Sequence, residues 1–365
     1  MYSILKGSIK VQTKITPDFK GKLNEKINLA RDKLIKLVKD IKKTDLKIYD
    51  LPSVVRPRRI AALDGGGIVK KFMGLTIIPA RAAGAIFEKD KKPQWIEKND
   101  VEILTLEDDT RNFTALFRDY LEVSVALELA EEHPEVLILD GSISSYAYKG
   151  LPHTLRYLLL SDKEIEEGTK SYRFYQLFIK YLNKAQSLLE YCLENEIILI
   201  GVSKDSRTNA LAKHLFKNKK KVPLINDTTL VSILAENRTG FTSPFEFKPT
   251  IRPIRKKVWE KANVFQKKSL QSFYLSYFIL KSGAQPIRVD SLLPQKDRLK
   301  EIQEVIVTYH DGNGFITPAY LSHNRAHMRD DLAQLIVNYL ASNVLETSPE
   351  TFKPFFTPQR RDIIQ

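Results

Sequence analysis

Residues 59–67 read Arg-Ile-Ala-Ala-Leu-Asp-Gly-Gly-Gly, and the rest of the chain is organised around this stretch. A short apolar run that ends in one carboxylate and three glycines predicts a buried strand, which delivers Asp64 to a turn that a ligand can approach closely. Residues 135–142 repeat the pattern as Glu-Val-Leu-Ile-Leu-Asp-Gly-Ser and place Asp140 at a second strand end. If the two strands are neighbours in one sheet, their carboxylates meet at its edge and can hold divalent metal for phosphoryl chemistry. An ordinary Asx-Gly turn at each position is the alternative.

Composition bounds the class of protein. The chain has 365 residues, of which 43% are hydrophobic and 28% charged, and this is ordinary for a globular protein. Cys192 is the single cysteine, so an internal disulfide and a cysteine-based zinc cage are excluded, and we expect a reducing, cytoplasmic location. Residues 1–14 lack an apolar run long enough for a signal peptide, and no run of about 18 apolar residues occurs. We therefore expect a soluble protein without a membrane partner.

Positive charge is concentrated in two regions of a chain whose net charge is +14. Residues 1–59 contain 16 Lys or Arg against 6 Asp or Glu, and residues 210–268 contain 14 against 4. Such regions attract a polyanion and make its binding salt-dependent, which indicates nucleic acid. A solvated basic surface, or the lysine-rich composition of proteins from hot environments, would produce the same charge.

The spacing of apolar residues predicts the elements around the first aspartate. Residues 17–43 predict a long amphipathic helix with a basic face. Residues 72–87 predict a strand that folds back on the Asp64 strand as a hairpin, residues 101–106 predict a third strand, and residues 110–132 predict a helix. Strand, strand, strand, helix, strand is the opening order of an RNase H-like fold, an α/β architecture with a mixed sheet flanked by helices.

The helix before the second aspartate carries glutamates that could complete a metal site. Glu122 is flanked by apolar residues, and Glu128 is its competitor. A carboxylate on the face toward the sheet would add a hard oxygen ligand for two Mg²⁺ or Mn²⁺ ions. Because most helical glutamates are exposed solubility residues, the pattern by itself leaves the choice open.

Later residues add further strands and a first phosphate candidate. Residues 163–195 predict a helix, and residues 196–202 and 273–280 predict strands. Arg207 opens the helix that follows the first of these strands. The start of a helix attracts anions, so Arg207 is a candidate for phosphate contact.

Residues 236–268 form a basic segment in which phenylalanine and tryptophan alternate with proline, lysine and arginine. This mixture suits single-stranded DNA, because aromatic rings stack on bases while cations follow the phosphates. The predicted DNA-binding residues are Arg255, Lys256, Lys257 and Trp259. The segment is an insertion that could instead form a lid or a dimer contact.

The expected domain organisation follows from these patterns. Residues 1–58 form a basic strand and helix region, residues 59–346 form the sheet domain that contains the 236–268 insertion, and residues 347–365 form a C-terminal extension. The three phenylalanines of the extension are unusual in a solvated tail. We expect them to pack against a neighbouring subunit or a partner ring.

In their order and spacing, these motifs resemble the NurA nuclease family over roughly residues 60–340. The motifs are the Asp64-Gly-Gly strand, a helix with Glu122 before Leu-Ile-Leu-Asp140-Gly-Ser, the run Gly201-Val-Ser-Lys-Asp, and the run Pro318-Ala-Tyr-Leu followed by Ala326-His327. The resemblance implies an RNase H-like, manganese-dependent nuclease with two ions, Mg²⁺ being the alternative metal. It implies digestion of DNA from the 5′ end and cutting of single strands. It also implies a homodimer that works with the hexameric HerA translocase in archaeal resection of double-strand breaks.

The resemblance assigns roles to single residues. Asp64 and Asp140 match the two strand-end aspartates of the family, and Glu122 matches the helix glutamate that precedes the second of them. Lys204 matches the lysine of the family, where a cation could steady the scissile phosphate or the departing oxygen. These residues form the implied catalytic set together with one histidine.

That histidine is His327, which matches the histidine on the last helix of the family, with His323 as its near rival. A neutral imidazole is a good ligand for Mn²⁺ and could also manage a proton during phosphodiester cleavage. Residues 223–227 resemble the next strand of the family. The roles of three further acids stay open, and these are Asp205, Asp227 and Asp290.

Two other functions remain compatible with the sequence. An ATP-dependent enzyme of the actin and sugar-kinase type also has two Asp-Gly phosphate loops, but it needs a late Gly-Gly adenosine loop, for which Asp311-Gly-Asn-Gly is a poor substitute. A DNA-binding scaffold whose acids only structure turns is the third candidate.

Overall fold

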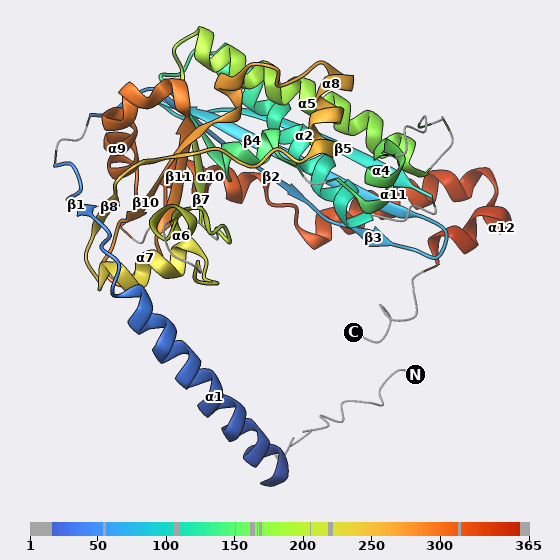
Figure 1. The fold of residues 1–365 in the computed structure, drawn as a ribbon. Coiled ribbons are helices and arrows are strands. Elements are labelled where there is room, and N and C mark those ends of the chain that lie inside the picture. The colour runs from blue at the N-terminus through green and yellow to red at the C-terminus, as the bar shows by residue number, and fades with distance from the viewer. Residues whose placement is uncertain are drawn as a thin grey trace.

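A mixed sheet with helices on both faces forms the body of the computed structural model (Figure 1). The described residues are 17–53, 56–105, 110–149, 151–160, 165, 167, 170–204, 206–217, 222–312 and 315–357. The strands are β1 (Ile48–Tyr49), β2 (Ile60–Gly67), β3 (Lys70–Lys71), β4 (Thr76–Phe87), β5 (Gln94–Leu104), β6 (Val136–Asp140), β7 (Ile198–Ser203), β8 (Gly240–Thr242), β9 (Phe245–Phe247), β10 (Phe273–Ile279) and β11 (Ile287–Leu292). The helices are α1 (Pro17–Ile41), α2 (Thr110–Glu131), α3 (Ile143–Ala147), α4 (His153–Leu160), α5 (Lys170–Glu194), α6 (Ala210–Leu215), α7 (Asp227–Ala235), α8 (Pro253–Ala262), α9 (Leu299–Thr308), α10 (Thr317–Ala326), α11 (Asp330–Thr347) and α12 (Pro349–Phe352), with 3₁₀ turns η1 (Lys268–Gln271), η2 (Leu293–Arg298) and η3 (Lys353–Phe356). Within the described ranges, no helix is long and apolar enough to cross a membrane.

The strand order confirms the expected RNase H-like architecture. The order is β1-β8-β10-β11-β7-β6-β2-β4-β3, with β5 paired to β4 and β9 paired to β10. β2 and β4 form the expected antiparallel hairpin, whereas β2, β6 and β7 run parallel. The register pairs Leu63 with Leu139, so the next residues, Asp64 and Asp140, lie side by side where β6 ends, while β2 continues to Gly67 in pairing with β4.

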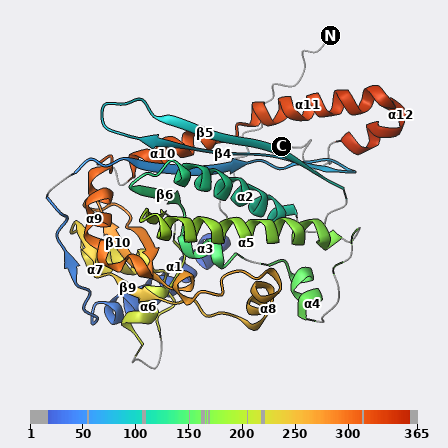
Figure 2. The same ribbon diagram turned by 90° about the horizontal axis from the view of Figure 1, so that it is seen from above.

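Successive residues of β2 face two different cores, because side chains alternate along a strand. Ala61 and Leu63 belong to a cluster that includes buried residues of α2 and α5, and Figure 2 shows these two helices side by side over the sheet. Ile60 and Ala62 belong to a second cluster that includes residues of α9 and α10. Burial on both faces explains why the strand is a continuous apolar run.

α1 extends away from the sheet, as Figure 1 shows. Its C-terminal end is held near α7, where Lys42 Nζ lies 2.6 Å from Glu236 Oε1. Apolar side chains along most of the helix are exposed, and they include Ile27 at 52% and Leu34 at 60%, whereas Ile41 at its C-terminal end is buried. Among the described residues, this helix therefore leaves an apolar stripe without a partner.

The segment 223–227 is not the strand that the resemblance suggested. Asn226 is the N-cap of α7, with its side chain accepting a hydrogen bond from the Thr229 amide at 2.8 Å, and Asp227 is the first helical residue. An Asn-Asp start is a strong helix-initiation signal, because these side chains satisfy amides that have no partner inside the helix.

The basic segment 236–268 is built into the body of this chain. β8 and β9 pair with β10 at the edge of the sheet. α8 contacts α4 and α5, and Val258 and Trp259 are buried beneath it. The segment therefore buries apolar side chains within its own chain.

The C-terminal residues contact the segment between β3 and β4 of the same chain. The Phe355 carbonyl accepts a hydrogen bond from the Gly74 amide, and the Thr357 carbonyl accepts one from the Met73 amide at 2.9 Å. The ring of Phe356 lies 6.0 Å from that of Phe72. A Cβ on Gly74 would lie 2.4 Å from the Phe355 ring, so glycine is required for this close contact. Phe355 and Phe356 therefore contact residues of their own chain, and the expected contact with a neighbouring subunit or a partner ring stays a prediction.

Candidate metal centre

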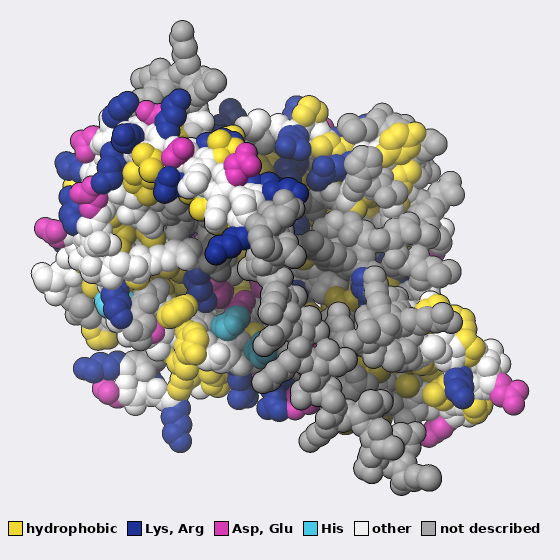
Figure 3. All heavy atoms as spheres, turned by 90° about the horizontal axis from the view of Figure 1, so that it is seen from below, with side chains coloured by type: hydrophobic (Ala, Val, Ile, Leu, Met, Phe, Trp, Pro, Cys, Tyr) yellow, Lys and Arg dark blue, Asp and Glu magenta, His cyan; other side chains and the backbone are white. Residues whose placement is uncertain are grey.

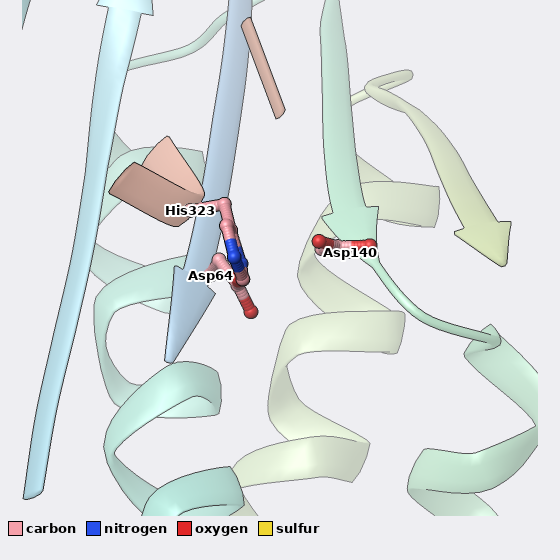
Figure 4. Close-up of side chains that lie close together, drawn as sticks. All are labelled: Asp64, Asp140 and His323. Atoms are coloured by element: carbon pink, nitrogen blue, oxygen red, sulfur yellow. The ribbon is translucent and has the colours of Figure 1, made fainter. Parts of the chain in front are cut away.

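Three side chains converge where β6 ends beside β2. The predicted turn after Asp64 is wrong, because β2 continues through the three glycines to Gly67 and stays paired with β4. One ligand atom each from Asp64, Asp140 and His323 lies within 4.8 Å of the other two. Figure 4 shows His323 descending from α10 beside Asp64, with Asp140 on the neighbouring strand turned toward them. From below, Figure 3 shows histidine and acidic side chains beside one another, with Lys or Arg side chains close by.

α10 delivers the histidine because its small residues pack directly on β2. Ser322 is fully buried, and its hydroxyl donates to the Ala62 carbonyl at 2.9 Å. A Cβ on Gly66 would lie 2.3 Å from the Ala326 carbonyl oxygen, so the glycine lets the end of the helix approach the strand. This anchoring places His323 Nδ1 2.5 Å from Asp64 Oδ2.

Asp64 is held in a polar but poorly hydrated position. Its side chain is 11% exposed, and Oδ1 accepts a hydrogen bond from the Gly65 amide at 2.7 Å. Burial raises the pKa of Asp64, and the negative charge of Asp140 raises it further, while the hydrogen bond with His323 acts in the opposite direction. A bound cation would relieve this unfavourable charge, so the site favours a positively charged ligand.

Glu122 reaches the same strand end from α2. A Cβ on Gly65 would lie 2.5 Å from both Cγ and Oε1 of Glu122, so the second residue of the Asp-Gly motif makes room for this carboxylate. Glu122 is 6% exposed, and its Oε1 lies 3.2 Å from Arg118 Nε. Burial and the neighbouring Asp119 hold the pKa of Glu122 well above its ordinary value.

Glu128 occupies a different face of α2. Its Oε1 lies 2.5 Å from Lys98 Nζ on β5, and its side chain is 42% exposed. At 3.6 residues per turn, six residues separate it from Glu122 by about a third of a turn around the axis. The sequence allowed either glutamate as the ligand candidate of α2, and of the two only Glu122 lies against Gly65 of β2.

Lys204 completes the predicted set at the end of β7. Its Nζ lies 2.9 Å from Asp140 Oδ2 and 5.9 Å from the centroid of the Phe315 ring. Since β7 is parallel to β6, its carboxyl end opens at the same edge of the sheet. The ammonium group of Lys204 is therefore held next to the carboxylate of Asp140, one of the three candidate metal ligands.

The structure corrects the choice between the two histidines. α10 ends at Ala326, and His327 is its C-cap with φ −57° and ψ 118°, so the chain turns away where a continuing helix would have stacked His327 over His323. The two rings are 6.5 Å apart between centroids. His323 joins the two aspartates, whereas His327 lies outside the group.

The open acids of the sequence have structural roles where the structure describes them. Asp227 is fully buried and accepts hydrogen bonds from the amides of Leu211 and Ala212 and from the Tyr277 hydroxyl. Asp290 is also fully buried, and its Oδ2 accepts from the Ser142 hydroxyl at 2.7 Å. Asp290 thereby shapes the loop that follows Asp140. Asp205 lies outside the described residues.

A cleft of about 630 Å³ opens above the carboxylates. We call it the metal cleft. Its lining residues are Asp140, Gly141, Ser142, Ser203, Lys204, Ser206, Arg207, Thr208, Arg288, Phe315, Tyr320 and His323. The predicted phosphate candidate Arg207 is exposed on its wall. It does not open a helix as predicted, because α6 begins at Ala210 with Asn209 as its N-cap. The cleft thus combines acidic ligands with cationic walls, which suits an anionic substrate that is bridged by a metal.

The expectation for α8 needs a correction. Trp259 is 3% exposed and packs at 5.4 Å from both Tyr148 and Phe265, so its ring cannot stack on a base in this conformation. Arg255 donates from Nη1 to the Lys149 carbonyl at 3.0 Å, and burial lowers its pKa to about 10. These two residues hold α8 in place.

The two lysines of the predicted DNA set differ in exposure. Lys256 is exposed and lies 3.5 Å from Glu260 on the same helix. Lys257 is partly buried. Lys256 is therefore the predicted DNA contact of α8 that keeps an open side chain.

A set of ion pairs that the sequence analysis missed lies behind Glu122. Arg118 contacts both Glu122 and Asp119, and Asp119 also pairs with Lys149. The spacing of four residues between Arg118 and Glu122 on α2 is a visible helical signal. The partner Lys149 is distant in sequence, so only the fold reveals that the set is connected to α8 through the Lys149 carbonyl.

The donor set fits a hard divalent cation. Carboxylate oxygens suit Mg²⁺ and Mn²⁺, and an imidazole nitrogen is accepted by Mn²⁺. Asp64, Asp140 and His323 could bind directly, and the buried Glu122 is close enough to the end of β2 to support them.

The chain is similar to known proteins both in sequence and in structure. A model of the NurA domain matches residues 58–327. The crystal structure of the NurA nuclease from Sulfolobus solfataricus is similar, with TM-score 0.66 and 17% identity, over 91% of this chain and 98% of that chain. A crystal structure of NurA with manganese has TM-score 0.60 and 13% identity, over 89% of this chain and 98% of that chain. Among curated proteins, none matches the chain.

Proposed function

The chain belongs to the NurA family, and on that premise we propose that it is a metal-dependent nuclease that hydrolyses phosphodiester bonds of DNA. The observation that carries this proposal is the convergence of His323 with Asp64 and Asp140, which lie on the adjacent parallel strands β2 and β6. The manganese in the similar NurA structure supports Mn²⁺, with Mg²⁺ as the alternative. Two ions would need more ligands than these three side chains, and Glu122 is the nearest further carboxylate.

Each residue of the proposed site has a distinct task. Asp64 and Asp140 supply negative oxygen ligands, and the contact of His323 with Asp64 fixes the orientation of both side chains. When bound, the metal would lower the pKa of water and stabilise negative charge on the phosphate. Glu122, with its raised pKa, can hold a proton next to the reacting groups.

Lys204 and Arg207 are proposed to orient the substrate. Lys204 lies beside Asp140, where its ammonium can donate to a phosphate oxygen or to the departing oxygen. Arg207 faces the same metal cleft and can bind an adjacent phosphate. The basic charge of the chain would then concentrate DNA near the site.

Finer properties of the family are part of the same proposal. These are 5′–3′ exonuclease and single-strand endonuclease activity, a homodimer, and cooperation with a HerA-type hexameric translocase in archaeal DNA end resection. The exposed apolar stripe of α1 supports an assembly contact, because a projecting helix with Leu34 at 60% exposure leaves apolar surface in water. Light scattering on the full chain tests the dimer.

The test of the proposed function is cleavage of end-labelled linear DNA with Mn²⁺, Mg²⁺ or chelator, each with and without ATP. We expect metal-dependent cleavage that needs no ATP and that disappears in Asp64→Asn. Activity that requires ATP would favour the kinase-like alternative. Binding without cleavage in every metal would favour the DNA-binding scaffold, and either result would overturn the proposal.

A further inference from the structure

A second polar hollow adjoins the metal cleft. It has a volume of about 560 Å³ and lies between α7 and the turn that joins β10 to β11. We call it the α7 pocket. Ser206 and Arg207 line both the α7 pocket and the metal cleft, so the loop after β7 is their shared wall.

The lining of the α7 pocket is rich in hydrogen-bonding groups and in positive charge. Its residues are Ser206, Arg207, Asn226, Thr228, Thr229, Ser232, Ala235, Asn237, Arg238, Ile279, Gly283, Ala284, Gln285 and Pro286. Two of these described residues are arginines and none is acidic. Hydroxyl and amide groups can meet the edges of a base or a sugar, and a guanidinium meets a phosphate. The pocket therefore suits a polar, anionic ligand.

Arg238 is held at the rim of this pocket by the end of α7. Its Nε donates to the Ala235 carbonyl at 3.2 Å, and its Nη2 donates to the Leu234 carbonyl at 3.4 Å. The preceding residue, Asn237, has φ 68°, a left-handed conformation that asparagine tolerates better than most residues. The turn after α7 thus presents the guanidinium in a fixed position.

The pocket is also mechanically tied to the metal cleft. Gln285 Nε2, in the β10–β11 turn, donates to the carbonyl of Lys204 at 3.4 Å. Asp227 anchors the start of α7 to the amides of α6 and to the hydroxyl of Tyr277. The two walls are therefore preformed and positioned relative to the lysine that contacts Asp140, as a subsite next to a reacting phosphate would require.

We propose that the α7 pocket binds a nucleotide of the same single DNA strand whose neighbouring phosphate lies in the metal cleft. The inference rests on the proposed nuclease function and adds a subsite to it. Its volume lies in the range of about 300–1,000 Å³ that encloses small ligands. A base can enter such a hollow only when it is unpaired and splayed from its neighbours, so the subsite selects single strands or frayed ends over an intact duplex.

Ser232 offers a test that leaves the proposed catalytic residues unchanged. It is an exposed lining residue in the middle of α7, and its hydroxyl donates to the Thr228 carbonyl four residues earlier at 3.0 Å. Glutamate and lysine are both good helix formers, so Ser232→Glu and Ser232→Lys differ in charge but not in helix propensity. Ser342 on α11 is a matched control, because it is exposed and donates to the Asn338 carbonyl in the same way at 2.9 Å.

The experiment measures competition of unlabelled DNA for a labelled single strand on full-length Asp140→Asn protein, which prevents cleavage. The competitors are a mononucleotide and single strands of about six nucleotides, a length in the range of a single-strand binding site. For the longer strands, we expect Ser232→Glu to weaken binding about tenfold and Ser232→Lys to preserve or strengthen it, because only the former repels phosphate. Both Ser342 variants should bind like the parent.

Two results would overturn the subsite. One is an equal effect of Ser232→Glu and Ser232→Lys on binding of the longer strands, and the other is no effect of either variant on those strands. Failure of the subsite is distinguishable from failure of the proposed function, because Mn²⁺-dependent cleavage by the wild-type chain is measured separately. If the wild-type chain cleaves DNA and the Ser232 pair shows no charge effect, the function stands and the subsite does not.

Discussion

The strand β2 and the helix α8 were both predicted to act on DNA, but the functional side chain of β2 lies beside a cleft whereas two of those of α8 pack against the rest of the protein. On β2, Asp64 lies close to Asp140 and His323 beside an open cleft. In α8, Trp259 is 3% exposed and Arg255 bonds to the backbone of Lys149. The alternation of side chains along a strand constrains where each one points. A basic and aromatic composition does not say which face of a helix is solvated.

The largest effect should separate these two regions directly. Asp140→Asn should reduce the initial rate of Mn²⁺-dependent DNA cleavage by about 10³ or more, because a catalytic metal supplies several kcal/mol of transition-state stabilisation. Lys256→Gln, on the exposed face of α8, should change the rate by less than about threefold, as expected for a rim charge. Losses of similar size in the two variants would remove the distinction.

The second effect concerns folding stability and tests the burial of α8. Trp259→Ala should lower the free energy of unfolding by about 3–5 kcal/mol, the usual range for a buried tryptophan. Lys256→Ala should change it by no more than about 0.5 kcal/mol, because it is a surface substitution. Urea unfolding followed by circular dichroism measures both. A Trp259→Ala protein of unchanged stability that binds DNA weakly would restore the base-stacking interpretation.

The third effect compares two glutamates on one helix. Glu122→Gln should slow cleavage about 10- to 100-fold, the range found when a group that supports metal ligands is altered. Glu128→Gln, whose carboxylate pairs with Lys98 on the surface, should stay within about twofold of the wild type. The reverse ranking in the same assay would show that α2 is rotated relative to the strand end.

The smallest effect is a pH dependence of the metal-free protein. Because the folded-state pKa of Asp64 is raised above its ordinary value of 3.8, the unfolded chain releases this proton first as the pH rises, and stability falls between the two pKa values. Asp64→Asn should therefore be more stable than the wild type at pH 7 by on the order of 1 kcal/mol and lose that advantage below about pH 3.8. Thermal unfolding in chelator across this pH range measures the difference. A destabilised Asp64→Asn protein at pH 7 would contradict the account.

The two aspartate strands were predictable because they are encoded locally. An apolar run followed by one aspartate and a glycine indicates a buried strand, and this was enough to place Asp64 beside Asp140. The turn expected after Asp64 was wrong, because β2 continues to Gly67 in pairing with β4. The role of Gly65 was only partly visible. Gly65 has no side chain, and this leaves room for Glu122 of α2. The sequence predicts the position of this helix along the chain but not which of its faces lies toward the strand.

The histidine and the helix α7 show what local pattern leaves out. On a continuous helix His323 and His327 would lie one above the other, and the end of α10 at Ala326 separates them. Helix ends are the boundaries that a sequence predicts least well. Asn226 is a residue type that favours a helix N-cap, although the family resemblance predicted a strand at residues 223–227. The burial of Trp259 depends on Tyr148 and Phe265, one of which is distant in sequence. Such contacts follow from the tertiary fold.

Mn²⁺ affinity, measured by isothermal titration calorimetry on the full-length wild type and on His323→Ala and His327→Ala, tests the central claim most directly. The account predicts that the wild type binds Mn²⁺, that His323→Ala binds it about 10- to 100-fold more weakly, and that His327→Ala binds it like the wild type. Loss of binding in His327→Ala with normal binding in His323→Ala would contradict the site, as would a wild-type protein that binds no Mn²⁺.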